Sequence, residues 1–112
     1  MKYRRGDVVI CAPPGDFGKP RPAVVLQSDL FNATHGSVTL CPITSHAVEA
    51  PLFRVPLAPS AANGLKAASQ LMADKLTTLR ADRIGQIVGR LSEPEMQEVE
   101  AAVLRWLGLK AY

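Results

Sequence analysis

The fold is decided by the stretch Arg5-Gly6-Asp7-Val8-Val9-Ile10 and, beyond a loop rich in proline and glycine, by Arg21-Pro22-Ala23-Val24-Val25-Leu26. Two apolar runs joined by turn-forming residues are typical of neighbouring strands. We expect a first strand over residues 7–12 and a second over residues 23–27. The loop between them is expected to be exposed, because prolines remove ladder donors and glycines favour turns. Arg21 then stands where this loop enters the second strand.

The composition predicts one small globular domain over residues 1–112. Hydrophobic residues make up 47% of the chain and charged residues 21%, which supplies a core and argues against disorder. No apolar run approaches the length of a membrane span, and no apolar signal segment follows the basic start, so we expect a cytoplasmic protein. The net charge of +3 is compatible with a nucleic-acid partner but does not require one.

The rest of the chain predicts short strands. A helical turn is expected over Ser28–Asn32, followed by β patterns at residues 37–41, 53–57, 69–79 (broken in the middle) and 86–91, with another helical turn at 81–85. Pro42 is expected to end the third strand, and the prolines near residues 53–57 indicate an edge strand. Turn signals about every ten residues favour a small, strongly bent sheet.

The C-terminal segment predicts one amphipathic helix. Ser92 and Glu95 have the spacing of a capping box, Pro94 fits the first turn, and Gly108 is a natural stop. One face of this helix then collects the apolar residues Met96, Val99, Val103, Trp106 and Leu107. We expect Trp106 to anchor the core or an interface. The whole pattern predicts a mostly β fold with a C-terminal helix, a small barrel of the SH3-like kind.

The cysteines and histidines do not form a recognisable metal or redox motif. Cys11 and Cys41 each end a β-like run, so we expect two buried thiols, and a disulfide only if their strands are neighbours. His35 and His46 are not spaced as a metal pair and are expected at the surface. We therefore expect neither a metal nor a cofactor.

Three positions could together carry chemistry on RNA. The 2′-hydroxyl of RNA can attack the adjacent phosphorus if one group takes a proton, one gives a proton, and donors stabilise the charge on the phosphoryl oxygens. Arg21 would supply a fixed charge and two donors, and Thr44 a hydroxyl donor. Asp74 could orient the arginine or accept a proton. These three side chains are sufficient for such a site if the fold brings them together.

Each of these residues also has a structural interpretation. An arginine at a strand end is usually a solubilising or salt-bridging group. Thr44-Ser45 could be a turn or a short helix cap, and Asp74 could be a turn residue paired with Lys75. On residue chemistry alone, both interpretations stay open.

The motifs in combination resemble the MazF/PemK family of toxin endoribonucleases over nearly the whole chain. Four segments match the family in order. Arg5–Val8 matches its Arg-Gly-Asp-Val segment, and Arg21–Val25 with Ser28–Asn32 matches Arg-Pro-Ala-Val-Val followed by Ser/Asn-Asp-x-Phe/Tyr-Asn. Pro42–Ser45 matches Pro-Ile/Val-Thr-Ser, and Asp74–Leu79 matches Asp-(Gln/Lys)-x-x-Thr-(Ile/Leu/Val). Any one segment is weakly specific, whereas their order and spacing are specific.

This resemblance implies a fold, an activity and partners. The family folds as a homodimer of SH3-like barrels of the MazF/PemK/CcdB type and supplies the toxin of type II toxin–antitoxin modules. Its members act as mRNA interferases: they cut single-stranded RNA at short sequences without a metal and leave 2′,3′-cyclic phosphate and 5′-hydroxyl ends. The implied partners are RNA, a cognate antitoxin that blocks the RNA groove, and operator DNA reached only through the antitoxin complex.

The resemblance also implies roles for individual residues. Arg21 matches the principal catalytic arginine, Thr44 matches a threonine that assists at the phosphate, and Asp74 matches an aspartate that is catalytic in some members. Met72 stands where some members carry an arginine two residues before that aspartate. Arg21 and Thr44 are therefore implied more directly than Asp74.

The first loop departs from the family. Pro13–Pro20 lacks the Ser/His-Glu-Gln element that contributes to RNA contacts in many members, so the resemblance implies no particular cleavage motif. Lys19 is our candidate for a phosphate contact there and Phe17 for a stacking face, with Ser45 as a further RNA contact.

Two other functions stay open on the sequence alone. A non-enzymatic gyrase poison such as CcdB resembles this family in structure and acts through its C-terminal end, which here is Trp106–Tyr112. An inactive regulator would only pair with an antitoxin. The retention of Arg21 and Thr44 argues against that regulator.

Overall fold

The computed structural model describes residues 3–12 and 19–110. The described part contains β1 (Asp7–Cys11), β2 (Arg21–Val25), α1 (Asp29–Asn32), β3 (Ser37–Thr44), β4 (Arg54–Leu57), β5 (Ser69–Met72), β6 (Thr77–Arg80), β7 (Ile84–Arg90) and α2 (Glu93–Leu107). Two 3-10 turns complete it, η1 (Ala73–Lys75) and η2 (Ala81–Arg83). The predicted class, mostly β with a C-terminal helix, is confirmed.

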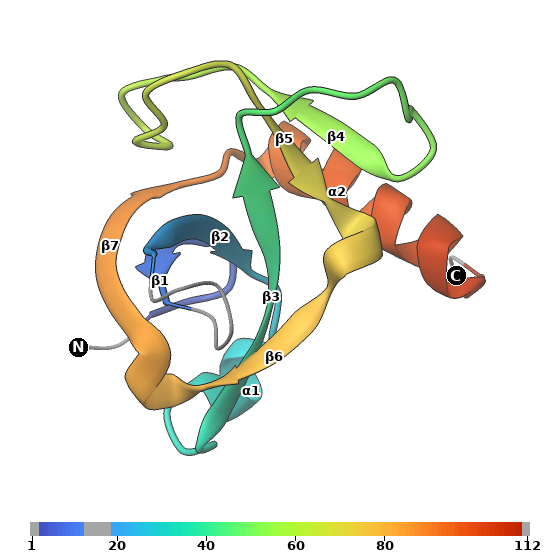
Figure 1. The fold of residues 1–112 in the computed structure, drawn as a ribbon. Helices are drawn as coiled ribbons and strands as arrows, with labels where there is room; N and C mark the ends of the chain where they lie inside the picture. Colours follow the sequence, from blue (N-terminus) through green and yellow to red (C-terminus); the bar gives the residue numbers. More distant parts are fainter. Residues whose placement is uncertain (1–2, 13–18, 111–112) are drawn as a thin grey trace.

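The strands form one strongly curled antiparallel sheet (Figure 1). Its order is β4-β5-β3-β2-β1-β7, and β6 pairs with β3 beside this path. Among the described residues, β6 pairs with β3 and β7 with β1, so the barrel-like curl is not closed by a β6–β7 ladder. The strand β4 lies at an edge, as its prolines predict.

Two apolar cores lie on opposite faces of this sheet, because side chains alternate along each strand. Val8 and Val24 belong to one core and their neighbours Val9 and Val25 to the other, and all four are fully buried. The first core lies under α2 and includes Cys41, Ile43, Val55, Leu57, Leu71 and Val99. The second lies within the curl of the sheet and includes Cys11, Ala23, Val38, Leu40 and Leu79.

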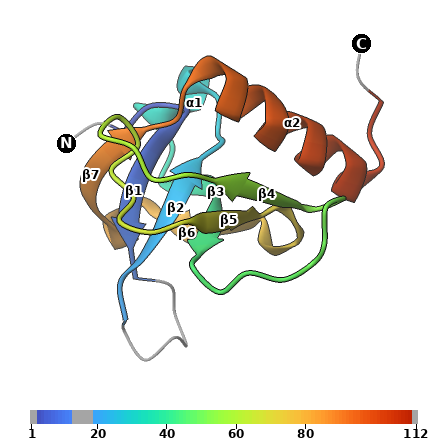
Figure 2. The ribbon, with the colours of Figure 1, turned by 90° about the horizontal axis from the view of Figure 1, so that it is seen from above.

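The helix α2 begins and ends as its sequence predicts. The Ser92 side chain accepts from the backbone N–H of Glu95, the Glu95 side chain accepts from that of Ser92, and Gly108 ends the helix in the left-handed conformation. Figure 2 shows α2 lying along the sheet beside β4 and β5. Among the described helices, none has the length and apolar content needed to cross a membrane.

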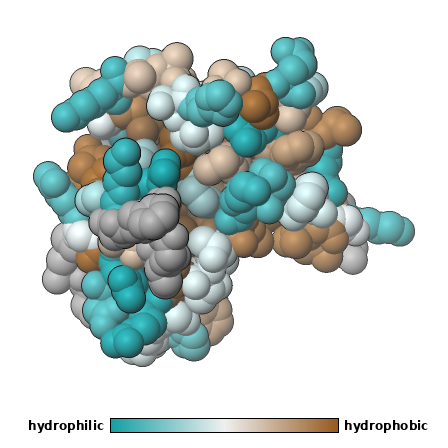
Figure 3. Space-filling view, in the orientation of Figure 1, coloured by the Kyte–Doolittle hydropathy of each residue, from teal (hydrophilic) through white to brown (hydrophobic). Residues whose placement is uncertain are grey.

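The apolar face of α2 is only partly buried. Met96, Val99 and Ala102 are in the core, whereas Trp106 is 50% exposed, and its ring lies tilted against that of Phe53 with 5.5 Å between the ring centroids. Figure 3 shows hydrophobic side chains among hydrophilic ones over this end of the helix and the neighbouring β3–β4 connection. Leu107 is also half exposed, so the last turn of this apolar face lies outside the core.

Two predicted boundaries are corrected by the pairing of the strands. β2 begins at Arg21 rather than Ala23, so the arginine is part of the strand. β3 does not end at Pro42 but continues to Thr44. Pro42 is tolerated because it lies where β3 exchanges β6 for β5 as its neighbour, so the missing N–H interrupts no continuous ladder.

The two thiols are buried and unpaired, as predicted. Cys11 lies on β1 and Cys41 on β3, with β2 between them, and they belong to different cores. A disulfide between them is therefore excluded by the topology. His35 and His46 are exposed, as expected.

Candidate functional site

A cleft of about 510 Å³ opens at the ends of β1, β2 and β3. One of its walls is the β4–β5 connection, residues 58–68, and another is β7; Figure 1 shows this connection leaning toward β7 across the top of the sheet. Its polar lining comes from Lys19, Arg21, Thr44, Ser45, Lys66, Ser69 and Gln86.

Arg21 and Thr44 meet in this cleft because of the strand register. β2 and β3 are antiparallel, with Val24 opposite Cys41 and Ala23 opposite Pro42. The same register continued by two residues places Thr44 across from Arg21. Both residues line the cleft, so the fold brings together the two side chains that the sequence analysis ranked first.

The Thr44 hydroxyl is oriented by the turn that follows it. The backbone N–H of His46 donates to Thr44 Oγ1 at 3.1 Å. Because a hydroxyl that accepts one hydrogen bond keeps its own proton for donation, Thr44 can still donate to a ligand oxygen.

The cleft attracts anions. Three cations line it, Lys19, Arg21 and Lys66, and none of its described lining residues is acidic. A phosphodiester chain is the biological anion that such a lining matches, and each lysine or arginine contact to a phosphate adds to affinity. The side chains of Arg21 and Lys19 are exposed to solvent.

The wall that carries Lys66 is fixed by a buried asparagine. The Asn63 side chain, fully buried, accepts from the backbone N–H groups of Ser60 and Leu65. The backbone N–H of Arg90, at the end of β7, donates to the carbonyl of Ala62 at 2.8 Å. These bonds hold the β4–β5 connection against β7, so Lys66 lines the cleft from a loop of fixed position.

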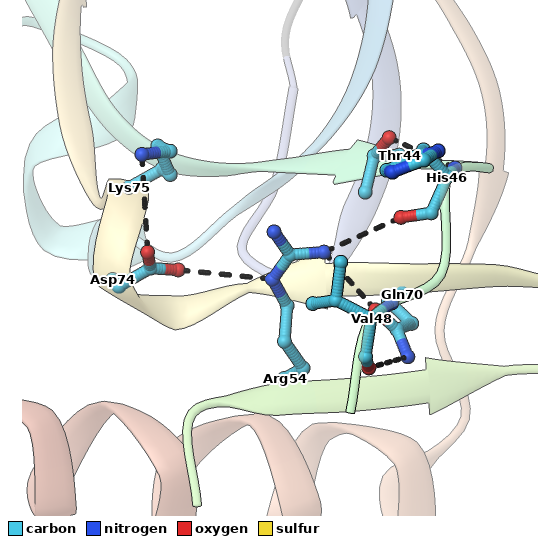
Figure 4. Close-up of polar contacts among 7 residues, drawn as sticks. All are labelled: Thr44, His46, Val48, Arg54, Gln70, Asp74 and Lys75. Carbon is cyan, nitrogen blue, oxygen red and sulfur yellow. Dashed lines mark hydrogen bonds and ion pairs between the residues drawn. The ribbon is translucent and has the colours of Figure 1, made fainter. Parts of the chain in front are cut away.

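Asp74 lies elsewhere, in η1 between β5 and β6. It is not among the residues that line the cleft. Its carboxylate is 4.0 Å from Nε of Arg54 and 3.9 Å from Nζ of Lys75 (Figure 4). The predicted group of three is therefore separated: Arg21 and Thr44 share a cleft, and Asp74 faces a different arginine.

The other predicted contacts fall partly within the described residues. Lys19 and Ser45 line the cleft beside Arg21. Phe17 lies outside the described residues. Sequence reasoning missed Lys66 and Gln86, which line the same cleft from the β4–β5 connection and from β7. The only signal for Lys66 was the turn pair Asn63-Gly64 just before it, which marks a loop but no function.

The two thiols are not positioned as nucleophiles. Burial raises the pKa of Cys41 to about 12, with a smaller contribution in the same direction from the charge of Asp74. Burial also raises the pKa of the Cys11 thiol. Both therefore stay protonated near neutral pH. Among residues 3–12 and 19–110, no three His, Cys, Asp or Glu side chains gather to hold a metal ion.

The arrangement fits stabilisation of a pentacoordinate phosphate. A guanidinium presents two parallel donors and a permanent charge, and a hydroxyl opposite it adds a third donor. A ribose 2′-hydroxyl needs only such stabilisation and proton transfer to attack its own phosphate, since nucleophile and phosphorus are already in one molecule.

A family model described as the PemK-like, MazF-like toxin of type II toxin–antitoxin systems matches residues 4–107. The chain is 43% identical over 107 residues to a protein of Mycolicibacterium smegmatis named probable endoribonuclease MazF, covering 95% of this chain and 97% of that protein. It is 30% identical over 115 residues to endoribonuclease MazF9 of Mycobacterium tuberculosis, with the same coverage.

Solved structures show the same fold. A mycobacterial endoribonuclease in complex with its cognate antitoxin superposes with a TM-score of 0.83 at 24% identity, over 98% of this chain and 99% of that one. A MazE–MazF structure from Deinococcus radiodurans superposes with a TM-score of 0.81 at 26% identity, over 98% of this chain and 100% of that one.

Proposed function

Because the chain belongs to the PemK-like, MazF-like toxin family of type II toxin–antitoxin systems, we propose that it is an endoribonuclease toxin whose cleavage site is the Arg21–Thr44 cleft. The substrate is single-stranded RNA, since only an unpaired strand can place its phosphate and 2′-hydroxyl freely between the strand ends. The observation that carries this proposal is the juxtaposition of Arg21 and Thr44 in a cleft with a cationic lining.

The proposed reaction is an intramolecular transphosphorylation. The 2′-oxygen gives its proton to solvent water and bonds to the adjacent phosphorus, and the bond from phosphorus to the 5′-oxygen breaks. The 5′-oxygen takes up a proton from solvent, so the products are a 2′,3′-cyclic phosphate and a 5′-hydroxyl. Arg21 neutralises the charge that builds on the phosphoryl oxygens, and Thr44 donates a hydrogen bond to one of them. This chemistry requires no metal.

The neighbouring residues bind the rest of the chain of nucleotides. Lys19 and Lys66 approach the cleft from two sides and are assigned to phosphates next to the one that is cut. Ser45 follows Thr44 in the lining and is assigned to a sugar or phosphate oxygen. These contacts set affinity, whereas Arg21 and Thr44 act at the reacting phosphate.

The experiment is incubation of the purified protein with a long unstructured RNA in excess EDTA, with fragment ends mapped. We expect discrete cuts with 5′-hydroxyl ends, and a loss on the order of a hundredfold or more in Arg21→Ala. The control is Arg80→Ala, which removes an exposed arginine whose partner is Asp82 and which does not line the cleft. Equal cleavage by wild type and a folded Arg21→Ala protein would overturn the assignment.

The same preparation separates the ribonuclease from a gyrase poison. The curated relatives are named endoribonucleases, which favours the enzyme over the poison. Deleting residues 109–112 leaves the cleft lining intact and removes the end through which a CcdB-like poison would act. A ribonuclease keeps its toxicity after this deletion, and a poison loses it.

The proposed partners follow from the family. Relatives in this family have been solved with an antitoxin, and we assign this chain a cognate antitoxin that covers the cationic cleft with an acidic, partly disordered segment. Homodimerisation is proposed together with it, as is binding to operator DNA only through the antitoxin complex. The cytoplasm is the proposed location, because the RNA substrate is there.

A further inference from the structure

Arg54 is a largely buried arginine outside the cleft. It lies on β4 opposite Met72 of β5, and its side chain is only 13% exposed. Its Nε and Oδ1 of Asp74 are 4.0 Å apart, and both atoms are buried without a hydrogen-bond partner. Two buried opposite charges stabilise each other, and removing one leaves the other uncompensated. Asp74 is therefore first of all the counter-ion of Arg54.

The other side of the Arg54 guanidinium faces the turn that carries Thr44. Its NH1 group donates to Oε1 of Gln70 at 3.0 Å and makes a longer contact, 3.5 Å, with the carbonyl of His46. Figure 4 shows the guanidinium between Asp74 on one side and the segment of Thr44, His46 and Val48 on the other.

Gln70 links Arg54 to the turn of residues 44–48 by hydrogen bonds. Its side-chain amide bonds both backbone groups of Val48: Oε1 accepts from the N–H at 3.1 Å, and Nε2 donates to the carbonyl at 3.0 Å. Gln70 also lies directly opposite Thr44 in the β3–β5 pairing, so the two side chains share a face of the sheet. The turn from Thr44 to Val48 is thus held at its start by β3 and at its end by Gln70.

We infer that Arg54 is a positioning residue for the cleavage site: it fixes the Thr44–Val48 turn through Gln70, and Asp74 acts on the cleft only through Arg54. The catalytic part of this inference rests on the function proposed above. Arg54 lies opposite Met72 in the β4–β5 pairing, and this position brings its guanidinium beside Asp74. A turn displaced by about 1 Å can lower a rate by roughly a hundredfold.

The test is a double-mutant cycle on RNA cleavage with Arg54→Met, Asp74→Asn and the double variant. We expect Arg54→Met to lower kcat roughly tenfold to a hundredfold, with KM within roughly threefold, because the cleft cations remain. In the Arg54→Met background, Asp74→Asn is expected to cause no further loss of kcat, because the arginine through which Asp74 acts on the cleft is absent. If the kcat loss of the double variant equals the product of the two single losses, Asp74 acts independently of Arg54 and the inference is overturned. A wild-type kcat in Arg54→Met would overturn it as well.

Two further variants separate position from charge and from folding. Arg54→Lys keeps the charge beside Asp74 but lacks the fork that reaches Gln70, so an intermediate kcat is expected. Arg105→Met removes a nearby exposed arginine whose Nε donates to the Leu52 carbonyl, and it is expected to leave kcat unchanged. An equal loss in Arg105→Met would mean that general charge, and not the turn, is responsible.

A structural measurement keeps the inference testable without catalysis. The Val48 amide should exchange its hydrogen roughly tenfold faster in Gln70→Leu and in Arg54→Met than in the wild type, because the first change removes its acceptor and the second loosens it. Unchanged exchange in a folded Arg54→Met protein would overturn the positioning role. If the wild type cuts no RNA, the proposed function fails, and this exchange measurement still decides whether Arg54 holds the turn.

Discussion

Gly64 lies directly against the carbonyl of Val88, so close that a Cβ atom at Gly64 would stand 2.2 Å from that oxygen. Its φ of +71° is also in the left-handed region that side chains rarely adopt. Gly64 and Val88 both line the cleft. The contact therefore decides how closely the Lys66 loop can approach β7.

Replacing Gly64 with alanine is expected to destabilise the protein by roughly 3 kcal/mol, because both the positive φ and the backbone clash must be relieved. The displaced loop would also carry Lys66 away from the cleft. Urea unfolding with Gly36→Ala as the control tests this, since nothing lies within 4 Å of a Cβ at Gly36. Equal unfolding midpoints for the two variants would contradict the strain assigned to Gly64.

Lys66→Gln is expected to weaken RNA binding roughly fivefold near 0.1 M salt and to reduce the slope of log K against log salt by about 0.7, the value for one phosphate contact on a single strand. Binding is measured with catalytically inactive Arg21→Ala as the background. Lys110→Gln removes the same charge from a residue that does not line the cleft, and its slope should match the background. A Lys66→Gln slope equal to that of Lys110→Gln would remove Lys66 from the RNA path.

The sequence predicts those parts of the fold that depend only on neighbouring residues. The capping box at Ser92 and the glycine stop at Gly108 specify the ends of α2 without any tertiary contact. The continuation of β3 past Pro42 could not be predicted, because it depends on where β3 changes partners, which is a property of the assembled sheet. The exposure of Trp106 depends on how far the sheet extends beneath the helix, and no periodicity contains that information.

The site could be predicted only in part, because the pairing of the strands determines which of its residues lie side by side. Arg21 and Thr44 carry chemically suitable side chains, but their juxtaposition follows from the β2–β3 pairing. Asp74 is chemically suited to the same site, but it pairs with Arg54 of β4, and no local pattern contains that long-range contact. Lys66 has no motif around it and enters the site through the position of its loop alone.

Ser92→Ala is expected to lower the free energy of unfolding by about 1 kcal/mol, the usual effect of losing an N-cap side chain. The Ser92 hydroxyl accepts from the Glu95 N–H at 3.2 Å, and that donor has no other partner within the helix. Ser92→Thr keeps the hydroxyl and should restore most of the loss. Denaturant titration of wild type, Ser92→Ala and Ser92→Thr measures this difference in stability. Identical unfolding midpoints for Ser92→Ala and wild type would mean that water replaces the cap.

Stability above neutral pH depends on Cys41, whose folded-state pKa of about 12 lies above the ordinary thiol value of 9.0 because of burial and the nearby Asp74 charge. Since the folded pKa is raised, the unfolded chain releases the thiol proton first as the pH rises. The contribution is therefore complete below the unfolded pKa and is lost progressively between about pH 9 and 12. The full loss is on the order of 4 kcal/mol, because each pKa unit corresponds to about 1.4 kcal/mol.

Removing the thiol isolates this effect from the other groups that titrate at high pH. Cys41→Ala is expected to be less stable than wild type at pH 7, because a buried sulfur leaves a small cavity, by roughly 1 kcal/mol. Its stability should then fall less steeply than that of wild type between pH 8 and 10.5, so the two curves converge as the pH rises. Denaturant unfolding across this range measures both curves. Parallel curves would show that the folded state admits water to the Cys41 thiol, so that burial does not raise its pKa.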